Sequence, residues 1–167
     1  MTQTKTLNLV RAAMFAALTC IATYVIKIPT PGTGGYIHFG DAFVLLSGIV
    51  LGPLYGAAAA GIGSALSDIV GGYVFYAPVT LLIKGLAAFA VGFLYRSLAG
   101  RIKSDRARSF LGSLTILFIV PLGYFVYEMI IYGPAAAASI PANIIQAASG
   151  VIIAFILYPL IKNFINR

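Results

Sequence analysis

Four long apolar runs constrain this chain more than any other feature. They cover residues 7–28, 78–95, 110–131 and 140–161, and each holds about 20 residues, the length at which an α-helix crosses a hydrocarbon core of about 30 Å. Across the 167 residues, 60% are hydrophobic and 9% are charged, whereas a soluble domain usually carries about 25% charged residues. The chain is therefore predicted to be an all-α integral membrane protein built as a single membrane domain.

Clusters of basic residues determine how many times the chain crosses. One lies near the N-terminus, one between residues 96 and 108, and one at the C-terminus. Cytoplasmic loops carry the excess of Lys and Arg, so an even number of crossings must separate any two clusters. Two apolar runs follow the middle cluster, as required. Before it lie two clear runs and the ambiguous stretch 41–68, which must supply two crossings or a re-entrant hairpin.

The pair Gly52-Pro53 divides that stretch, because proline removes a backbone donor and tends to end the preceding helix. The two resulting helices are shorter than a normal span, so tilt, local thinning or incomplete crossing is expected. We predict a bundle of six transmembrane helices with both termini in the cytoplasm. The segments are 7–28, 42–51, 54–67, 78–96, 109–131 and 140–161.

Polar residues within these segments gather near the ends predicted to be external. Ionisable groups in a membrane segment are costly, so each is a candidate functional residue. Lys84 lies about 9 Å inside the fourth segment at 1.5 Å per residue, and Glu128 lies no deeper in the fifth. We predict an external cavity for a small, polar, flat molecule. Its candidate substrate-binding residues are Lys84, Glu128, Asn143, Gln146, Tyr124, Tyr127, Asp68, Tyr76 and His38.

Structural roles compete with ligand binding at several of these positions. We interpret Asp41, which follows a glycine at a helix start, as an N-cap rather than a ligand. Lys84 could extend along its stem toward the interface, and Glu128 could neutralise Lys84, since buried charges usually find partners. Tyrosines also form interfacial belts that need no ligand. The loop 29–40 is longer than the usual helix connection of 2–8 residues, which favours a movable lid.

The sequence lacks the motifs of the common enzymes. It has no phosphate-binding G-x-x-x-x-G-K-[ST] loop, and its one histidine, His38, is too few for a zinc site or a Ser–His–Asp triad. We therefore predict no enzyme activity, no cofactor and no metal. The net charge of +7 follows from the positive-inside rule and does not require a nucleic-acid partner.

The first segment contains two overlapping Ala-x-x-x-Ala patterns, Ala12/Ala16 and Ala13/Ala17. Small residues four apart let helices approach closely in lipid, where packing drives association. An ordinary contact within the chain is one interpretation. The other interpretation is a docking surface for a partner protein. It is favoured because the sequence contains no nucleotide-binding motif that could power transport.

The chain resembles the S component of an energy-coupling factor (ECF) vitamin transporter over nearly its whole length. The resemblance rests on size, six segments, the alanine patterns, and the stretches Gly35–Asp41, Leu51–Gly56 and Ser67-Asp68. It implies a subunit of the bacterial plasma membrane that binds a vitamin from outside and joins a transmembrane coupling protein and two cytoplasmic ATPases. It also implies that the alanines of the first segment dock the coupling protein and that loop 29–40 is the lid.

The pattern is most similar to the hydroxymethylpyrimidine or pyridoxine branch of that family. Tyrosines with Asn143, Gln146, Lys84 and Glu128 suit a small heteroaromatic ring bearing hydroxymethyl groups. The chain has no tryptophan, which argues against a thiamine-type pocket with a stacked indole. Pantothenate, with Lys84 as counter-ion, and riboflavin remain alternatives, as do a stand-alone small-solute facilitator and a scaffold protein.

Overall fold

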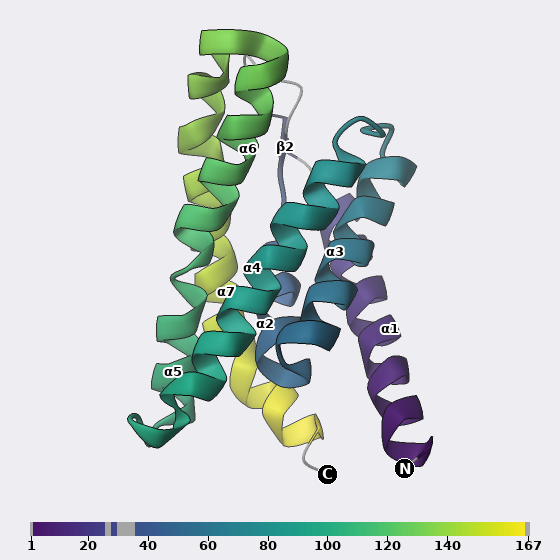
Figure 1. Cartoon of the computed structure of the whole chain (residues 1–167), viewed down its shortest axis with the longest axis vertical. Coiled ribbons are helices and arrows are strands. Elements are labelled where there is room, and N and C mark those ends of the chain that lie inside the picture. Colours follow the sequence, from purple (N-terminus) through teal and green to yellow (C-terminus); the bar gives the residue numbers. More distant parts are fainter. Residues whose placement is uncertain (1, 26–27, 30–35, 166–167) are drawn as a thin grey trace.

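In the computed structural model, residues 2–25, 28–29 and 36–165 are described, and they form a bundle of helices (Figure 1). Strands β1 (Ile28–Pro29) and β2 (Tyr36–Ile37) pair antiparallel at the base of the first loop. The remaining regular structure of the described residues is helical. The α-helices are α1 (Thr2–Val25), α2 (Asp41–Leu51), α3 (Pro53–Val70), α4 (Ala77–Ser97), α5 (Asp105–Ser113), α6 (Ile116–Tyr132) and α7 (Ile140–Ile165), and the 3-10 helices are η1 (Leu98–Gly100) and η2 (Gly133–Ser139).

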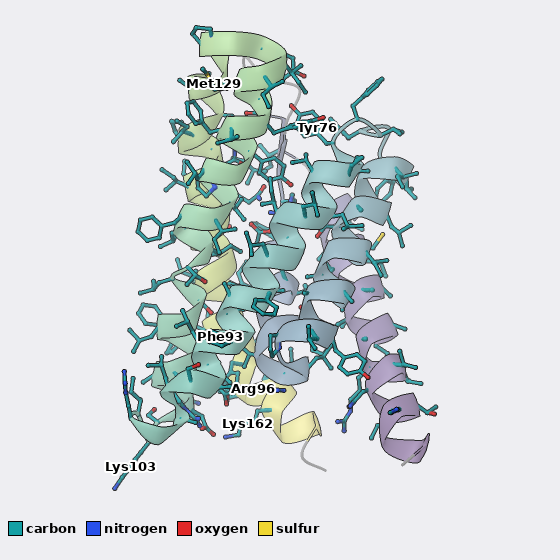
Figure 2. All side chains as sticks on the ribbon, viewed as in Figure 1. Tyr76, Phe93, Arg96, Lys103, Met129 and Lys162 are labelled. Carbon is teal, nitrogen blue, oxygen red and sulfur yellow. The ribbon has the colours of Figure 1, made fainter. Side chains whose placement is uncertain are left out.

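The start of α1 and the end of α7 lie at the same end of the bundle, together with the start of α5 (Figure 1). We call this the basic end, because Arg96, Lys103 and Lys162 lie there (Figure 2). The opposite end holds the turn between α3 and α4 and the helix η2. We call it the tyrosine end, after Tyr76 (Figure 2). The basic clusters therefore share one end, as an even number of crossings between them requires.

Large apolar side chains cover the outside of the long helices. Ile130 is 82% exposed, Phe118 74% and Leu82 67%, and a surface of this kind is found where a protein meets lipid or a partner. Within the described residues, three helical stretches are long and apolar enough to cross a membrane. They are Lys5–Val25, Ala77–Gly100 and Asp105–Lys162, the last running through α5, α6, η2 and α7.

The chain breaks at Gly52-Pro53, between α2 and α3. Gly52 has φ +83°, a conformation that side-chain-bearing residues rarely adopt, and Pro53 opens α3 at a position where its missing N–H costs nothing. With 11 residues, α2 is about 16 Å long, roughly half of a hydrocarbon core. Its first residue, Asp41, therefore lies near the middle of the bundle. Helix α3 has 18 residues and is longer than the segment 54–67 predicted from the sequence.

Glycines bring the backbones of α2, α3 and α4 into contact near the basic end. A Cβ atom on Gly48 would lie 2.2 Å from the carbonyl oxygen of Ala88, and one on Gly92 would lie 2.5 Å from the carbonyl oxygen of Gly48. A Cβ atom on Gly56 would lie 2.6 Å from the Cα of Gly48. Contacts this close require glycine, and they are typical of helix packing in membranes.

The single segment predicted over 109–131 is divided in two, as α5 and α6. Ser104 caps α5 by accepting a hydrogen bond from the backbone N–H of Ala107 at 3.3 Å, which moves the helix start to Asp105. The hydroxyl of Thr115 donates to the carbonyl oxygen of Gly112 at 2.8 Å, in the turn between the two helices. The residues between the fifth and sixth predicted segments are not a simple connector, because Gly133–Ser139 form η2.

Candidate functional site

Polar side chains meet in the interior between the middle of the bundle and the tyrosine end. Helix α4 packs against α2 and α6, and α2 also packs against α7. Along α4, Tyr76 at the N-cap, Thr80 and Lys84 are four residues apart, so they lie on one face. Tyr124 and Glu128 are four apart on α6. Two groups of residues result, one at the level of Asp41 and one nearer the tyrosine end.

The deeper group, which we call the ion-pair cluster, consists of Asp41, Lys84 and Gln146. Lys84 Nζ donates to Asp41 Oδ1 at 2.5 Å, and both side chains are fully buried. Gln146 Nε2 donates to Asp41 Oδ2 at 3.0 Å, and Gln146 Oε1 accepts from the backbone N–H of His38 at 3.2 Å. Both carboxylate oxygens are therefore occupied, and Asp41 also lies at the positive end of the α2 dipole.

Three interpretations of the sequence are wrong at this cluster. Asp41 is not an N-cap: Gly40 holds that position, no side chain caps the helix, and the Asp41 carboxylate binds Lys84 instead. Lys84 does not extend to the interface, because it is fully buried. Its partner is not Glu128, because the start of α2 places Asp41 at the depth of Lys84, while Glu128 lies nearer the tyrosine end.

The second group, which we call the tyrosine cluster, consists of Tyr76, Tyr124, Tyr127, Thr80 and Glu128. Glu128 is 2% exposed, and its Oε1 accepts from the Tyr76 hydroxyl at 3.1 Å. Its Oε2 is buried and has no hydrogen-bond partner among the described residues. The ring of Tyr76 lies 5.4 Å from that of Tyr127 and 6.4 Å from that of Tyr124, between centroids. The hydroxyls of Tyr124 and Thr80 are 2.9 Å apart.

Two contacts connect the tyrosine cluster to its surroundings. Lys84 Nζ lies 5.4 Å from the centre of the Tyr124 ring, within cation–π range, and this joins the two clusters. The Tyr127 hydroxyl donates to the carbonyl oxygen of Phe75 at 2.5 Å, which ties the α3–α4 turn to α6. Burial, the Tyr132 hydroxyl and Glu128 together raise the pKa of Tyr76, so its hydroxyl stays protonated and donates to the carboxylate.

The other candidate binding residues lie around these clusters or apart from them. His38 is buried and contributes its backbone N–H, while its ring Nδ1 accepts from the backbone N–H of Gly40 at 3.0 Å. Asn143 is half-buried on α7 and makes no hydrogen bond to a described residue of either cluster. Asp68 is buried on α3, which packs against α1, α2 and α4 rather than against α6. Of the predicted lid 29–40, residues 30–35 lie outside the described residues.

The alanine patterns of α1 face in two directions. Ala12 and Ala16 are partly buried and pack against the core, and a Cβ atom on Gly63 of α3 would lie 2.3 Å from the carbonyl oxygen of Ala16. Ala13 and Ala17 are exposed. An apolar groove of about 430 Å³ lies between α1 and α7 near the basic end. Met14 and Leu18 of α1 and Leu160 of α7 line it.

A helical membrane protein with buried polar clusters toward one end is typical of solute-binding membrane subunits. Similarity to known proteins then identifies the family. The family model for the "ECF-type riboflavin transporter, S component" matches residues 3–163, so the chain belongs to this family. It is a transporter subunit of vitamin uptake and not an enzyme. This confirms the resemblance found in the sequence.

Two relatives and one solved structure are also similar to this chain. A Pyrococcus woesei protein described as "Uncharacterized protein in gap 3'region" is 37% identical over 134 residues, which are 80% of this chain and 86% of that protein. The "Thiamine precursor transporter HmpT" of Lactococcus lactis subsp. cremoris is 28% identical over 152 residues, covering 90% of this chain and 84% of that protein. A solved structure titled "Structure and mechanism of the S component of a bacterial ECF transporter" has the same fold, with a TM-score of 0.69 and 20% sequence identity. The match covers 98% of this chain and 99% of that chain.

Proposed function

We propose that this S component captures a small heteroaromatic vitamin or precursor, of the hydroxymethylpyrimidine or pyridoxine type, and passes it to an ATP-driven complex. The observation that carries this proposal is the pair of buried clusters between the middle of the bundle and the tyrosine end. The relative named as a thiamine precursor transporter supports the pyrimidine type, because a hydroxymethylpyrimidine is such a precursor. Riboflavin is the second candidate, because the family model carries its name.

The proposed orientation follows from the distribution of charge. The basic end faces the cytoplasm, the tyrosine end faces outside, and the chain crosses a bacterial plasma membrane six times. In this orientation the tyrosine cluster is the first polar group that an external solute meets, and the ion-pair cluster forms the floor beneath it. Asp41 and Thr80 are added to the ligand contacts predicted from the sequence because they complete the clusters. The proposed contacts are therefore Asp41, Thr80, Lys84, Glu128, Asn143, Gln146, Tyr124, Tyr127, Asp68, Tyr76 and His38.

The proposed partners are the ECF coupling protein and two cytoplasmic ATPases. Ala13 and Ala17 present small side chains on the outside of α1, and an apolar groove lies between this helix and α7. A helix of the coupling protein could approach the α1 backbone closely at the two alanines. Ala12 and Ala16 already pack within the chain, so we assign docking to the exposed pair.

Ligand retention tests the proposed capture function. The protein is purified in mild detergent, denatured, and the released small molecules are identified by mass spectrometry. We expect a hydroxymethylpyrimidine or pyridoxine to be recovered, and added ligand at 100 times its Kd to stabilise the fold by about 2.7 kcal/mol. Recovery of riboflavin alone would favour the second candidate. If no vitamin were retained and none raised the unfolding temperature, the capture function would be wrong.

A second measurement separates a subunit from a stand-alone facilitator. The chain is reconstituted in liposomes alone and together with the coupling protein and ATPases, and uptake of the retained vitamin is followed. We expect uptake only with the complete complex and ATP. Uptake by the chain alone would show a facilitator.

A further inference from the structure

We propose that Glu128 recognises an N–H donor on the ligand, so that the site selects rings bearing an amino group or a protonated nitrogen and rejects anions. This inference rests on the proposed capture function, because it assigns the chemistry of the same site. It starts from one atom. Glu128 Oε2 is buried in the interior and has no hydrogen-bond partner among the described residues.

An unsatisfied carboxylate oxygen in a protein interior is costly and rare. The other oxygen of Glu128 holds the Tyr76 hydroxyl at 3.1 Å, which fixes the orientation of the carboxylate. A ligand N–H directed at Oε2 would supply the missing bond. Each carboxylate oxygen accepts more than one hydrogen bond, so two parallel N–H groups could bind the carboxylate while Tyr76 remains in place.

The surroundings of Glu128 suit a flat, electron-poor or cationic ring. Three tyrosine rings lie near it, with Tyr76 at 5.4 Å from Tyr127 and 6.4 Å from Tyr124 between centroids. Aromatic faces attract cations and pack against flat rings in offset or edge contacts. The paired hydroxyls of Thr80 and Tyr124 provide both a donor and an acceptor for a hydroxymethyl group on the same ring.

The only cation of the two clusters is not available for an anionic ligand. Lys84 is bound to Asp41 at 2.5 Å with both side chains fully buried, so an anion would have to displace a carboxylate that Gln146 also holds. The two clusters contain two acidic side chains, Asp41 and Glu128, and one basic side chain, Lys84, which is paired with Asp41. A ligand that donates hydrogen bonds or carries a positive charge suits this excess of acidic side chains, whereas an anion such as pantothenate does not.

Matched ligands test the inference on the unaltered protein. Binding is measured by calorimetry for the hydroxymethylpyrimidine with its ring amino group, for the same ring with that amine replaced by hydrogen, which leaves no N–H donor, and for pantothenate. We expect the amino compound to bind at least tenfold more tightly than the compound without the amine, and pantothenate to bind most weakly. Equal binding of the first two, or tighter binding of pantothenate, would overturn the inference.

A variant then assigns the selectivity to one side chain. Glu128→Gln keeps the shape but removes the charge and one acceptor, so we expect it to weaken binding of the amino compound about 10- to 150-fold and to bring the two ring compounds within about twofold. Asp105→Asn, at the basic end, is the control and should change neither affinity. Unchanged selectivity in Glu128→Gln would remove Glu128 from recognition while leaving capture intact. If the unaltered protein bound no vitamin at all, the capture function itself would fail.

Discussion

The buried pair of Lys84 and Asp41 is held by more than its own attraction. Asp41 also accepts from Gln146 and lies at the first residue of α2, where the helix dipole favours negative charge. A buried ion pair gains less than it appears to, because both ions lose their hydration. The ion pair therefore contributes less to net stability than to positioning: it fixes the start of α2 against α4 and α7.

Removing one member of this pair should be far more damaging than removing both. Lys84→Met leaves the Asp41 carboxylate buried without its cation, and we expect a loss of about 3–5 kcal/mol. The double variant Lys84→Met/Asp41→Leu should recover most of that loss. Thermal unfolding in detergent, compared between the single and double variants, measures both effects.

The matched control is an acid at the basic end. Asp105 binds Arg108 and Lys162 but is about one-third exposed on its side chain, so Asp105→Asn should cost about 0–1 kcal/mol. If Lys84→Met were as mild as this control, the ion-pair cluster would have no structural importance.

Sequence reasoning located most of these side chains but not their pairings. Lys84, Glu128 and Gln146 were found because polar groups in an apolar segment are costly. The role of Asp41 was missed, since an acid after a glycine at a helix start is equally typical of an N-cap. Choosing between the roles requires the depth of Asp41 in the bundle. That depth follows from the short length of α2. The available signal in the sequence was Lys84, which lies well inside the fourth predicted segment and needs an acidic partner at the same depth.

Among the elements, α2 and α3 were predictable and the division between α5 and α6 was not. Gly52 and Pro53 act through their own backbone chemistry, which is visible in the sequence. The run over 110–131 contains Gly112, Ser113 and Thr115 near its start, but small and hydroxyl-bearing residues are also common inside membrane helices, so they do not by themselves predict the turn near Thr115. In that turn the Thr115 hydroxyl donates a hydrogen bond to a backbone carbonyl oxygen. The pattern of apolar residues does not predict such a local hydrogen bond.

The two faces of α1 should respond differently to the same substitution. Ala13→Leu/Ala17→Leu adds bulk on the exposed face, so vitamin binding should persist while association with the coupling protein and uptake are lost. Ala12→Leu/Ala16→Leu adds bulk against the core and α3, and we expect it to destabilise the protein by more than 1 kcal/mol. Binding assays, co-purification and thermal unfolding on both variants check this. An Ala13/Ala17 variant that assembled normally would move the docking surface elsewhere.

At the scale of the whole molecule, the start of α1 and the end of α7 lie at the same end of the bundle, which supports the even crossing count (Figure 1). The distribution of basic residues allowed this arrangement to be predicted, because topology depends on charge in the loops rather than on details of packing. The path of the first loop was not predictable in the same way. Its base pairs as a short ladder of β1 and β2, and its glycines and prolines are compatible with many conformations.

Labelling from one side of the membrane tests the orientation. In a Cys20→Ala background, single cysteines replace Lys103 at the basic end and Ala135 in η2, and intact cells are treated with a membrane-impermeant thiol reagent. We expect Ala135→Cys to react and Lys103→Cys to react only after the cells are opened. The reverse result would invert the topology, and reaction of both in intact cells would contradict the crossing count.

The glycine contacts between α2, α3 and α4 limit how these helices can move. At Gly48, Gly56 and Gly92, backbone meets backbone with no side chain between them. Single side chains therefore cannot open a gap between these three helices. Near the basic end α2, α3 and α4 form one unit, and any movement there displaces whole helices.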